Sequence, residues 1–460
     1  MVLAKYFKTK CFLVTGGKMK TQLNQIGKSA LSIINSTIIV LPFMIFIQIA
    51  NQHTFISVLP FVLFYTFRMT GIFLIRGVKT SFNSYTLLHF SLYCGSLGCL
   101  LGVLGTLYFP LYIISGILLG LSAAWLPMSN TSVTYFLKKN NRLTKTHLPL
   151  LLGMFLLIGC SLFFPAPFKY LGFFLLYGIL YLFSFRNLSQ LTDYKVDIHD
   201  LEGISYKYLV LFFSFFSLIF FLRASRLLFN HVEFDYFIYG FFFLIILYMI
   251  ATSIFKDKIH RKISADLTYL TYINGAVGNY LFLFCSLYAA GYYGHKQLFL
   301  QFYLPYVFGI ILAAKIRPLL GHYAKQYALL GILFGLITIV FTPFFPIGVL
   351  LTSTFKGALN AWITAQYEEI KTVSEDKRIW VKYSLQNIGS ILHQFLLMLL
   401  GSFIILDKGL SLKSFFVITS TPVQTLKSMQ LMTSWNVIAT SLIILIILIY
   451  GFVYLRPRKR

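Results

Sequence analysis

Fourteen long apolar stretches, separated by short polar segments, run along the chain. A polypeptide in hydrocarbon must satisfy its own backbone hydrogen bonds, so apolar stretches of about twenty residues are typical of membrane-spanning helices. The pattern therefore predicts an all-α integral membrane protein with fourteen transmembrane helices. The predicted spans are 30–50, 54–76, 85–107, 109–129, 147–165, 168–186, 207–229, 234–255, 271–291, 297–315, 326–344, 346–366, 383–405 and 433–455.

Basic residues gather in alternate short loops between these spans. The loops concerned are 138–145, 256–262, 315–325 and 371–382, and the tail 456–460 is basic as well. Cytoplasmic loops of membrane proteins carry an excess of lysine and arginine. We therefore expect both termini in the cytoplasm and the protein in the cell (plasma) membrane, with the bilayer as its surroundings.

Composition agrees with this interpretation and narrows it. Hydrophobic residues make up 58% of the chain, and its net charge is +26. No basic domain stands apart from the spans, so the charge fits a cytoplasmic belt facing anionic lipid headgroups and not a nucleic-acid partner. The five cysteines form no disulfide framework, and no Cys/His spacing resembles a metal site. We expect no metal and no cofactor.

Short sequence words recur at a nearly constant offset, which indicates an internal repeat. The offsets are 239, 245 and 237 positions, and each relates one span to the eighth span after it. The paired words are Ile34-Asn35-Ser36 with Ile273-Asn274-Gly275, Leu59-Pro60 with Leu304-Pro305, and Ala124-Trp125 with Ala361-Trp362.

The repeat divides the predicted protein into two six-helix pseudo-repeats joined by a two-helix insert. The expected parts are a cytoplasmic N-terminal segment (1–29), a first six-helix bundle with its linker (30–206), the insert and its loop (207–270), a second six-helix bundle (271–455) and a basic cytoplasmic tail (456–460).

This arrangement resembles the major facilitator superfamily in its fourteen-helix, drug-exporter-like form. The resemblance is one of topology, because the family's Gly-x-x-x-Asp-Arg-x-Gly-Arg pattern after the second helix is not matched. That loop reads Arg76-Gly77-Val78-Lys79-Thr80-Ser81, and the corresponding loop of the second half, from Arg317 to His322, also lacks an aspartate. The resemblance implies alternating access to a cavity lined by the first and fourth helices of each half.

Two other classes remain open. Fourteen-helix lipid-linked oligosaccharide flippases, related to multidrug and toxin extruders, have two six-helix halves followed by two terminal helices. The repeat offset favours the insert between the halves over that order. An integral-membrane glycosyltransferase has less support, because it needs carboxylates at the outer ends of early spans, and only Glu233 and Asp235 occur there, after the seventh span. An acyltransferase uses a buried histidine, for which His393 is the candidate, but nothing else supports it. We therefore expect a transporter and not an enzyme.

Charges inside the predicted spans are the strongest indication of a site, because an ionised group at bilayer depth costs several kcal/mol unless it is paired or hydrated. The thirteen acidic residues lie in the loops or at the ends of the spans. Lys356 lies ten residues from either end of its span, about 15 Å at the helical rise. Arg68 lies in the inner half of the second span. Arg223 and Arg226 are close enough to a span end to extend to the interface.

The resemblance places polar residues of four spans on the cavity: Asn35, Ser122, Asn274, Asn279, Lys356 and Asn360. Together with Arg68, these are the candidate substrate-binding residues. Amides and a cation without carboxylates suit an anionic or amphiphilic substrate, either a small molecule or a lipid. The alternative interpretation is hydrogen bonding between helices, which is common in membrane bundles.

His393 lies on a polar stripe of the thirteenth span. Its neighbours on the stripe are Gln386, Asn387, Ser390 and Gln394. A titrating histidine can relay protons, whereas a hydrogen-bonded structural histidine is the alternative. With no carboxylate in the spans, proton coupling would have to involve His393 or an acidic residue at a loop edge, such as Glu368.

Overall fold

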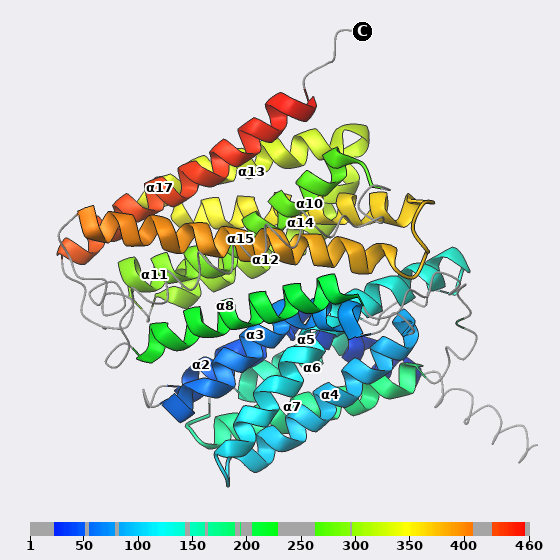
Figure 1. Ribbon diagram of the computed structural model, residues 1–460. Helices are drawn as coiled ribbons and strands as arrows, with labels where there is room; N and C mark the ends of the chain where they lie inside the picture. The colour runs from blue at the N-terminus through cyan, green and yellow to red at the C-terminus, as the bar shows by residue number, and fades with distance from the viewer. Residues whose placement is uncertain are drawn as a thin grey trace, which may run out of the picture. The chain divides into compact units, whose positions relative to one another are not determined.

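The computed structural model is all-helical, with no strand in the part of the chain that it describes (Figure 1). The described residues are 23–50, 55–78, 82–142, 148–161, 164–188, 194, 205–228, 263–294, 297–407 and 426–455. The predicted span 234–255, most of the loop 406–432, the first 22 residues and the tail 456–460 lie outside these residues.

Among the described helices, eight are long and apolar enough to cross a membrane, or nine if one bent pair counts as a single span. They indicate a membrane-embedded protein. Helices α14 (Phe345–Glu369) and α15 (Arg378–Asp407), of 25 and 30 residues, have the length but are not among the eight. The eight are Ile56–Val78, Ser84–Gly105, Pro110–Lys139, Phe168–Arg186, Ala265–Tyr293, Leu300–Leu319, Gly321–Val340 and Met429–Tyr454.

The described helices form two compact units. The last described helix of the first unit is α8 (Tyr206–Leu228), and the first described helix of the second is α10 (Ala265–Asn279). In the first unit α5 contacts both α3 and α4, and α7 packs on α4. Aromatic side chains such as Phe46, Phe64 and Phe174 fill its interior. Its labelled helices are α2 (Leu41–Ile49), α3 (Phe55–Val78), α4 (Ser84–Gly105), α5 (Pro110–Lys139), α6 (Leu148–Ser161), α7 (Phe168–Leu188) and α8 (Tyr206–Leu228).

The first predicted span, 30–50, is not one straight helix. A helix over Leu23–Thr37 is followed by α2, and the two axes differ by 57°. Pro42 occupies the first turn of α2. Proline has no backbone N–H to donate to the preceding turn, so the chain restarts as a new helix here.

Helix α8, the first helix of the predicted insert, packs along α3 in the first unit. The guanidinium of Arg76, near the end of α3, lies 3.9 Å from the ring centroid of Tyr208, and Arg76 is buried. The Ser205 N–H donates to the Gly77 carbonyl at 3.1 Å. The side chains of Arg223 and Arg226 lie outside the described part of the structure.

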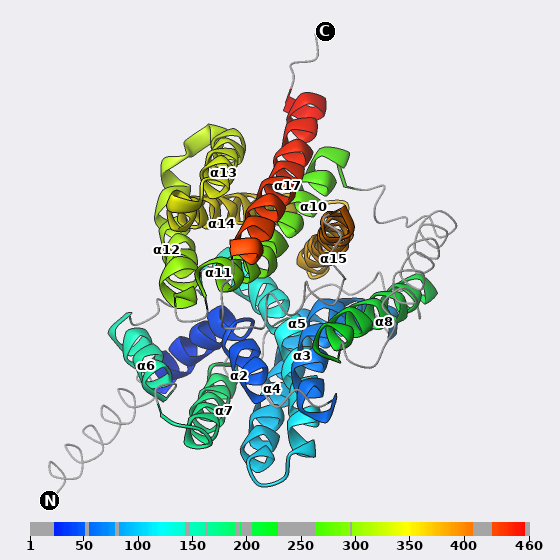
Figure 2. The ribbon, with the colours of Figure 1, turned by 90° about the vertical axis from the view of Figure 1, so that its left-hand side faces the viewer.

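The second unit repeats one packing relationship of the first. Helix α14 contacts α12 and α13 as α5 contacts α3 and α4, while α15 lies beside α10, and α17 packs on α13, α11 and α10 (Figures 1 and 2). The helices are α10 (Ala265–Asn279), α11 (Ser286–Tyr293), α12 (Leu304–Leu319), α13 (Ala324–Val340), α14 (Phe345–Glu369), α15 (Arg378–Asp407) and α17 (Leu426–Tyr450).

A π-helical segment, Tyr280–Cys285, joins α10 to α11 within one continuous candidate span. Its six residues are all buried. The rings of Tyr280, Phe284 and Tyr288 stack in sequence along this segment, and the Tyr280 hydroxyl lies 2.6 Å from Thr440 Oγ1 of α17. Wide turns of this kind occur often at functional sites.

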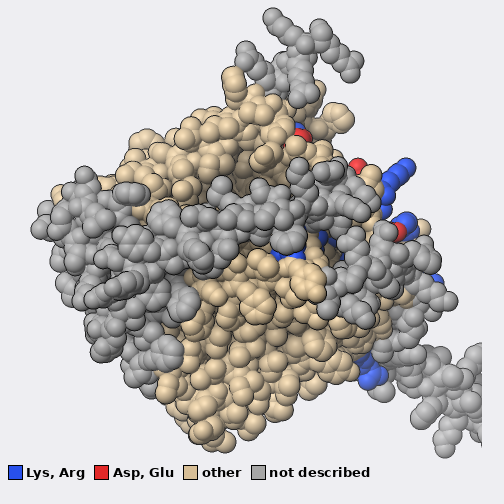
Figure 3. All heavy atoms as spheres, viewed as in Figure 1, with Lys and Arg blue, Asp and Glu red and all other residues tan. Residues whose placement is uncertain are grey.

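Uncharged side chains cover most of the described surface on the face that Figure 3 presents, and charged side chains are few there. Exposed large apolar residues on α12 and α13 include Phe308, Ile311, Phe334 and Ile337. A water-soluble protein rarely exposes apolar patches of such extent, whereas lipid contact accounts for them directly.

Candidate functional site

Helix α14 carries a ladder of polar residues at every fourth position: Lys356, Asn360, Thr364 and Glu368. Residues four apart lie on one face of a helix, so the ladder forms a polar stripe over three turns. Within the stripe, Thr364 Oγ1 donates to the Asn360 carbonyl at 2.7 Å. Lys356 and Asn360 are both half-buried.

Helix α10 faces this ladder with matching polar positions. The Asn274 side chain is completely buried, and its Nδ2 donates to Asn360 Oδ1 at 3.0 Å. Toward one end the hydroxyls of Thr271 and Tyr367 lie 3.2 Å apart. The predicted candidates Asn274 and Asn360 are therefore in direct contact.

Lys356 lies one helical turn further along the same interface, against Gly278 of α10. A Cβ atom built on Gly278 would lie 3.2 Å from Lys356 Cε and 3.3 Å from its Nζ. The glycine thus leaves the space in which the end of the lysine side chain lies. Any larger residue at this position would meet the ammonium group directly.

A second lysine, Lys382 of α15, reaches the same ladder. It is completely buried, and its Nζ donates to Thr364 Oγ1 at 2.7 Å. The like charge of Lys356 and the opposite charge of Glu368 both act on Lys382. Two lysines on neighbouring helices therefore contribute to one polar interface of α10, α14 and α15, which we call the lysine seam.

Sequence reasoning assigned Lys382 to a cytoplasmic loop and missed its burial. The structure begins α15 at Arg378, so Lys382 lies in the second turn of a continuous helix. A signal was present in the chain: Lys382, Gln386, Ser390 and Gln394 recur at every fourth position. This spacing places Lys382 on the polar stripe that the sequence indicated around His393.

Helices α10 and α15 approach each other closely enough for their backbones to touch. A Cβ atom on Gly275 would collide with the Gln386 carbonyl, and one on Gly389 would collide with the Tyr272 carbonyl. Among the described residues, Gln386 Oε1 and Asn274 Oδ1 are buried acceptors without a hydrogen-bond partner. The lysine seam therefore contains two lysines together with two buried amide oxygens that accept no hydrogen bond from the described residues.

Asn279 and His393 form a separate pair near the π-helical segment. His393 Nδ1 lies 3.3 Å from Asn279 Oδ1, and both side chains are buried. His393 also lines a pocket of about 550 Å³ between α10, α15 and α17. The structure thus joins the two predicted residues by a contact between α10 and α15.

The remaining candidates belong to the first unit. Ser122 is fully buried, and its hydroxyl lies 2.9 Å from the Tyr181 hydroxyl of α7. Asn35 is half-buried, with an Oδ1 that has no hydrogen-bond partner among the described residues. The guanidinium of Arg68 lies 5.6 Å from the ring centroid of Tyr65. Ser122 is thus held in a packed interface.

In the described part of the chain, no group of three or more His, Cys, Asp or Glu side chains is arranged to hold a metal ion. The lysine seam offers ammonium groups, amides and hydroxyls, with the carboxylate of Glu368 at one end of the ladder. Ammonium, amide and hydroxyl groups bind anions and hydrogen-bonding solutes.

The sequence matches no protein-family model and no curated protein.

Proposed function

We propose that the protein is a membrane transporter that moves an anionic solute, small or amphiphilic, by alternating access. In this proposal the substrate's anionic group lies against the lysine seam, with Lys356 and Lys382 as its cationic contacts. The observation that carries the proposal is the burial of Lys382 on α15 beside Lys356 on α14.

The physical reason is electrostatic. An ammonium group loses hydration when it is buried, and a second cation nearby adds repulsion. Lys356 and Glu368 act on Lys382 with opposite signs. A bound anion would offset both the desolvation and the repulsion, and charge-assisted hydrogen bonds would hold it in place.

The proposed architecture has fourteen transmembrane helices in two six-helix pseudo-repeats, with 207–255 as an insert between them. In this proposal the protein lies in the plasma membrane, and both of its termini are in the cytoplasm. The repeated packing of α3, α4 and α5 as α12, α13 and α14 supports it. In the resembling superfamily the ninth and twelfth spans line the transport cavity, and in this chain these spans contain α10 and α14 of the seam.

The packing of the last two helices favours this order over that of the oligosaccharide flippases. Helix α15 packs on α10 and α14, and α17 packs on α13, α11 and α10. In the flippase order these two helices would follow two complete halves. Here they are integral to the second unit, as expected for the fifth and sixth helices of a repeat.

The test is transport by purified protein in proteoliposomes. The probes are labelled inorganic phosphate, succinate and the amphiphilic anion taurocholate, with the cation tetraphenylphosphonium and glucose as comparison solutes. We expect saturable movement of at least one anion. Lys356→Gln should lower its apparent affinity about tenfold to a hundredfold, the range for one charged hydrogen bond, and Lys356→Arg should retain part of it.

The matched control is Lys315→Gln on α12, because Lys315 is exposed. It should transport like the parent protein. Movement of tetraphenylphosphonium or glucose without any anion, or anion transport unchanged in Lys356→Gln, would contradict the proposal. Retained thermal stability of each variant shows that a loss of transport is not a loss of folded protein.

A further inference from the structure

The turn between α12 and α13 combines a free positive charge with exposed apolar side chains. Arg317, in the last turn of α12, is exposed, and its side chain forms no ion pair or hydrogen bond with any residue that the structure describes. Leu319 is 81% exposed and Tyr323 is 59% exposed. Basic residues beside protruding apolar ones are typical of segments that lie at a membrane surface.

The backbone brings these side chains together at the end of two candidate spans. Leu300–Leu319 and Gly321–Val340 are both long and apolar enough to cross a membrane, so the turn lies where the chain leaves the bilayer and re-enters it. The Leu320 N–H donates to the Arg317 carbonyl at 3.3 Å. Gly321 follows with a φ of 53°, a left-handed conformation that glycine adopts without strain. The chain therefore reverses within a few residues and leaves Arg317, Leu319 and Tyr323 on one short connection.

The basic connection between α14 and α15 differs, because its cations are committed to protein groups. Lys377 Nζ lies 3.6 Å from the centroid of the Trp380 ring. Arg378 donates to the carbonyls of Glu368 and Val373, at 2.6 and 3.0 Å. Basic loops in general attract anionic lipid, but of these two connections only the α12–α13 turn presents its arginine to the surroundings.

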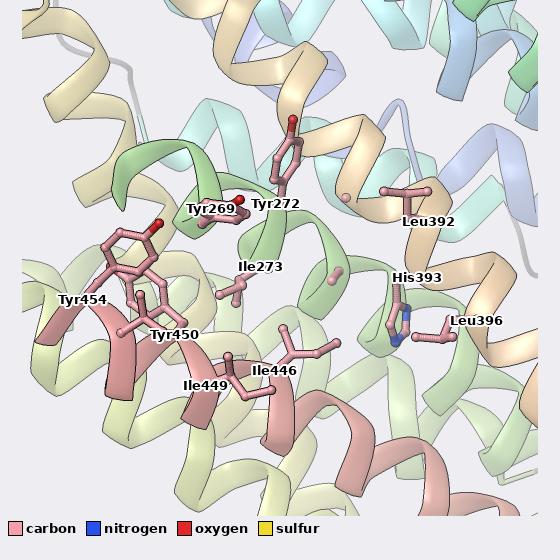
Figure 4. A pocket seen from close by; sticks show the side chains of 13 residues that line it. Tyr269, Tyr272, Ile273, Leu392, His393, Leu396, Ile446, Ile449, Tyr450 and Tyr454 are labelled. Atoms are coloured by element: carbon pink, nitrogen blue, oxygen red, sulfur yellow. The ribbon is translucent and has the colours of Figure 1, made fainter. Parts of the chain in front are cut away.

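Asp266 brings a carboxylate to this end of the second unit, but that carboxylate is already engaged. It accepts from Lys325 Nζ at 3.1 Å and from the Tyr450 hydroxyl, and Tyr450 lies beside Tyr454 on α17 (Figure 4). From Asp266 to Glu368 the sequence contains no further acidic residue. A headgroup ammonium would therefore find no uncommitted carboxylate among the described residues of the turn, whereas a net anionic headgroup needs none.

We infer that the α12–α13 turn binds a net anionic phospholipid, with the lipid phosphate against Arg317 and with Leu319 and Tyr323 inserted beside the acyl chains. A guanidinium offers a phosphate two parallel N–H groups. The exposed leucine gains by leaving water for the membrane boundary, and tyrosine is enriched at that depth. The site is apart from the lysine seam, and its occupancy does not depend on the proposed transport.

The experiment uses full-length Leu319→Trp protein in nanodiscs of phosphatidylglycerol and phosphatidylcholine at one fixed ratio. Bromine atoms are carried by the acyl chains of the first lipid in one preparation and of the second lipid in the other. Bromine quenches a tryptophan that it contacts, and the signal of the parent protein, with its four tryptophans, is subtracted. We expect the new tryptophan to report about fivefold enrichment of phosphatidylglycerol over its bulk fraction, the factor for one basic residue at an anionic surface.

Matched variants separate a phosphate contact from general attraction. Leu330→Trp is the control reporter, because Leu330 is 59% exposed but lies inside α13, and it should report no enrichment. In the Leu319→Trp protein, Arg317→Gln should abolish the enrichment. Lys315→Gln, which removes the same charge from the same helix, should retain most of it. The substituted side chains are all exposed, and an unchanged thermal midpoint shows that each variant is folded.

Three results would overturn the inference. Quenching of Leu319→Trp in proportion to the bulk fraction of each lipid would show ordinary lipid contact without selection. Equal loss of enrichment in Arg317→Gln and Lys315→Gln would show diffuse attraction to the basic loop, which needs no phosphate at Arg317. No quenching of Leu319→Trp by either lipid would place the turn in water, and an acidic protein surface would then be its candidate partner.

Discussion

Lys382 Nζ of α15 donates to Thr364 Oγ1 of α14 at 2.7 Å, and the lysine side chain is completely buried. Thr364 in turn donates to the Asn360 carbonyl, so a short hydrogen-bond chain runs from the buried ammonium to the polar ladder of α14. This relationship connects two helices through a lysine that we expected in a cytoplasmic loop.

Lys382→Met should separate stability from transport. Replacing a buried charge by an apolar side chain of similar length is often neutral or stabilising, so we expect an unchanged or higher thermal midpoint. Affinity for the transported anion should fall about tenfold to a hundredfold. Differential scanning fluorimetry and anion uptake measure the two effects. Lys382→Met with full anion affinity would remove Lys382 from the substrate site.

Thr364→Val tests the contact itself by a double-mutant cycle. Removing the acceptor of a buried ammonium should destabilise the protein by about 1–3 kcal/mol. In the Lys382→Met background the same substitution should have a much smaller effect, because no ammonium remains to be satisfied. Denaturation midpoints of the four proteins give the coupling. Equal destabilisation in both backgrounds would mean that Thr364 acts through another contact.

Gly278→Ala should displace Lys356 without disturbing the helix. Its new methyl group would lie 3.2–3.3 Å from Lys356 Cε and Nζ, close enough to force the flexible lysine to move. Alanine favours the helix by up to about 1 kcal/mol over glycine, so folding should not suffer while anion affinity falls.

The control for that substitution is Gly153→Ala in α6, where a Cβ atom would meet nothing within 4 Å. It should leave uptake unchanged. If Gly278→Ala transported like Gly153→Ala, the position of the Lys356 ammonium would not matter for substrate binding.

Carboxylates inside the predicted spans should not couple a pH gradient to transport. The thirteen acidic residues lie outside the predicted spans or at their ends, so proton coupling would have to involve His393 or an acidic residue at a loop edge such as Glu368. We expect either transport that follows the substrate gradient or proton coupling that is lost when both residues are replaced. Gradient-driven uptake in proteoliposomes that survives His393→Gln together with Glu368→Gln would contradict this expectation.

The helical class and the membrane setting could be predicted from the sequence, because apolar stretches of span length are a strong signal. Lys356 and its neighbour Asn360 could be singled out for the same reason: polar groups stand out in apolar spans. The break at Pro42 within the first span was not anticipated, although proline supplies its physical cause.

Contacts between helices could not be predicted. The partnership of Asn274 with Asn360, and that of His393 with Asn279, depend on which faces meet, and helices that are apolar on all sides carry little amphipathic signal. Ser122 illustrates the limit. The resemblance placed it on a cavity, whereas its hydroxyl lies against Tyr181 in the first unit. Lys382 was misplaced because a cation at a span end looks the same whether it faces solvent or another helix.

The π-helical segment Tyr280–Cys285 marks where this span tolerates a change in length. A π-turn holds one residue more than an α-turn, so losing one residue inside the segment restores regular α-helix and leaves both flanking helices facing as before. Asn274 and Gly278 precede the segment and meet α14, whereas Tyr288 follows it and packs on Phe345. A single-residue deletion in the regular helix between these contacts would instead turn one of the two surfaces by about 100° and away from its partner.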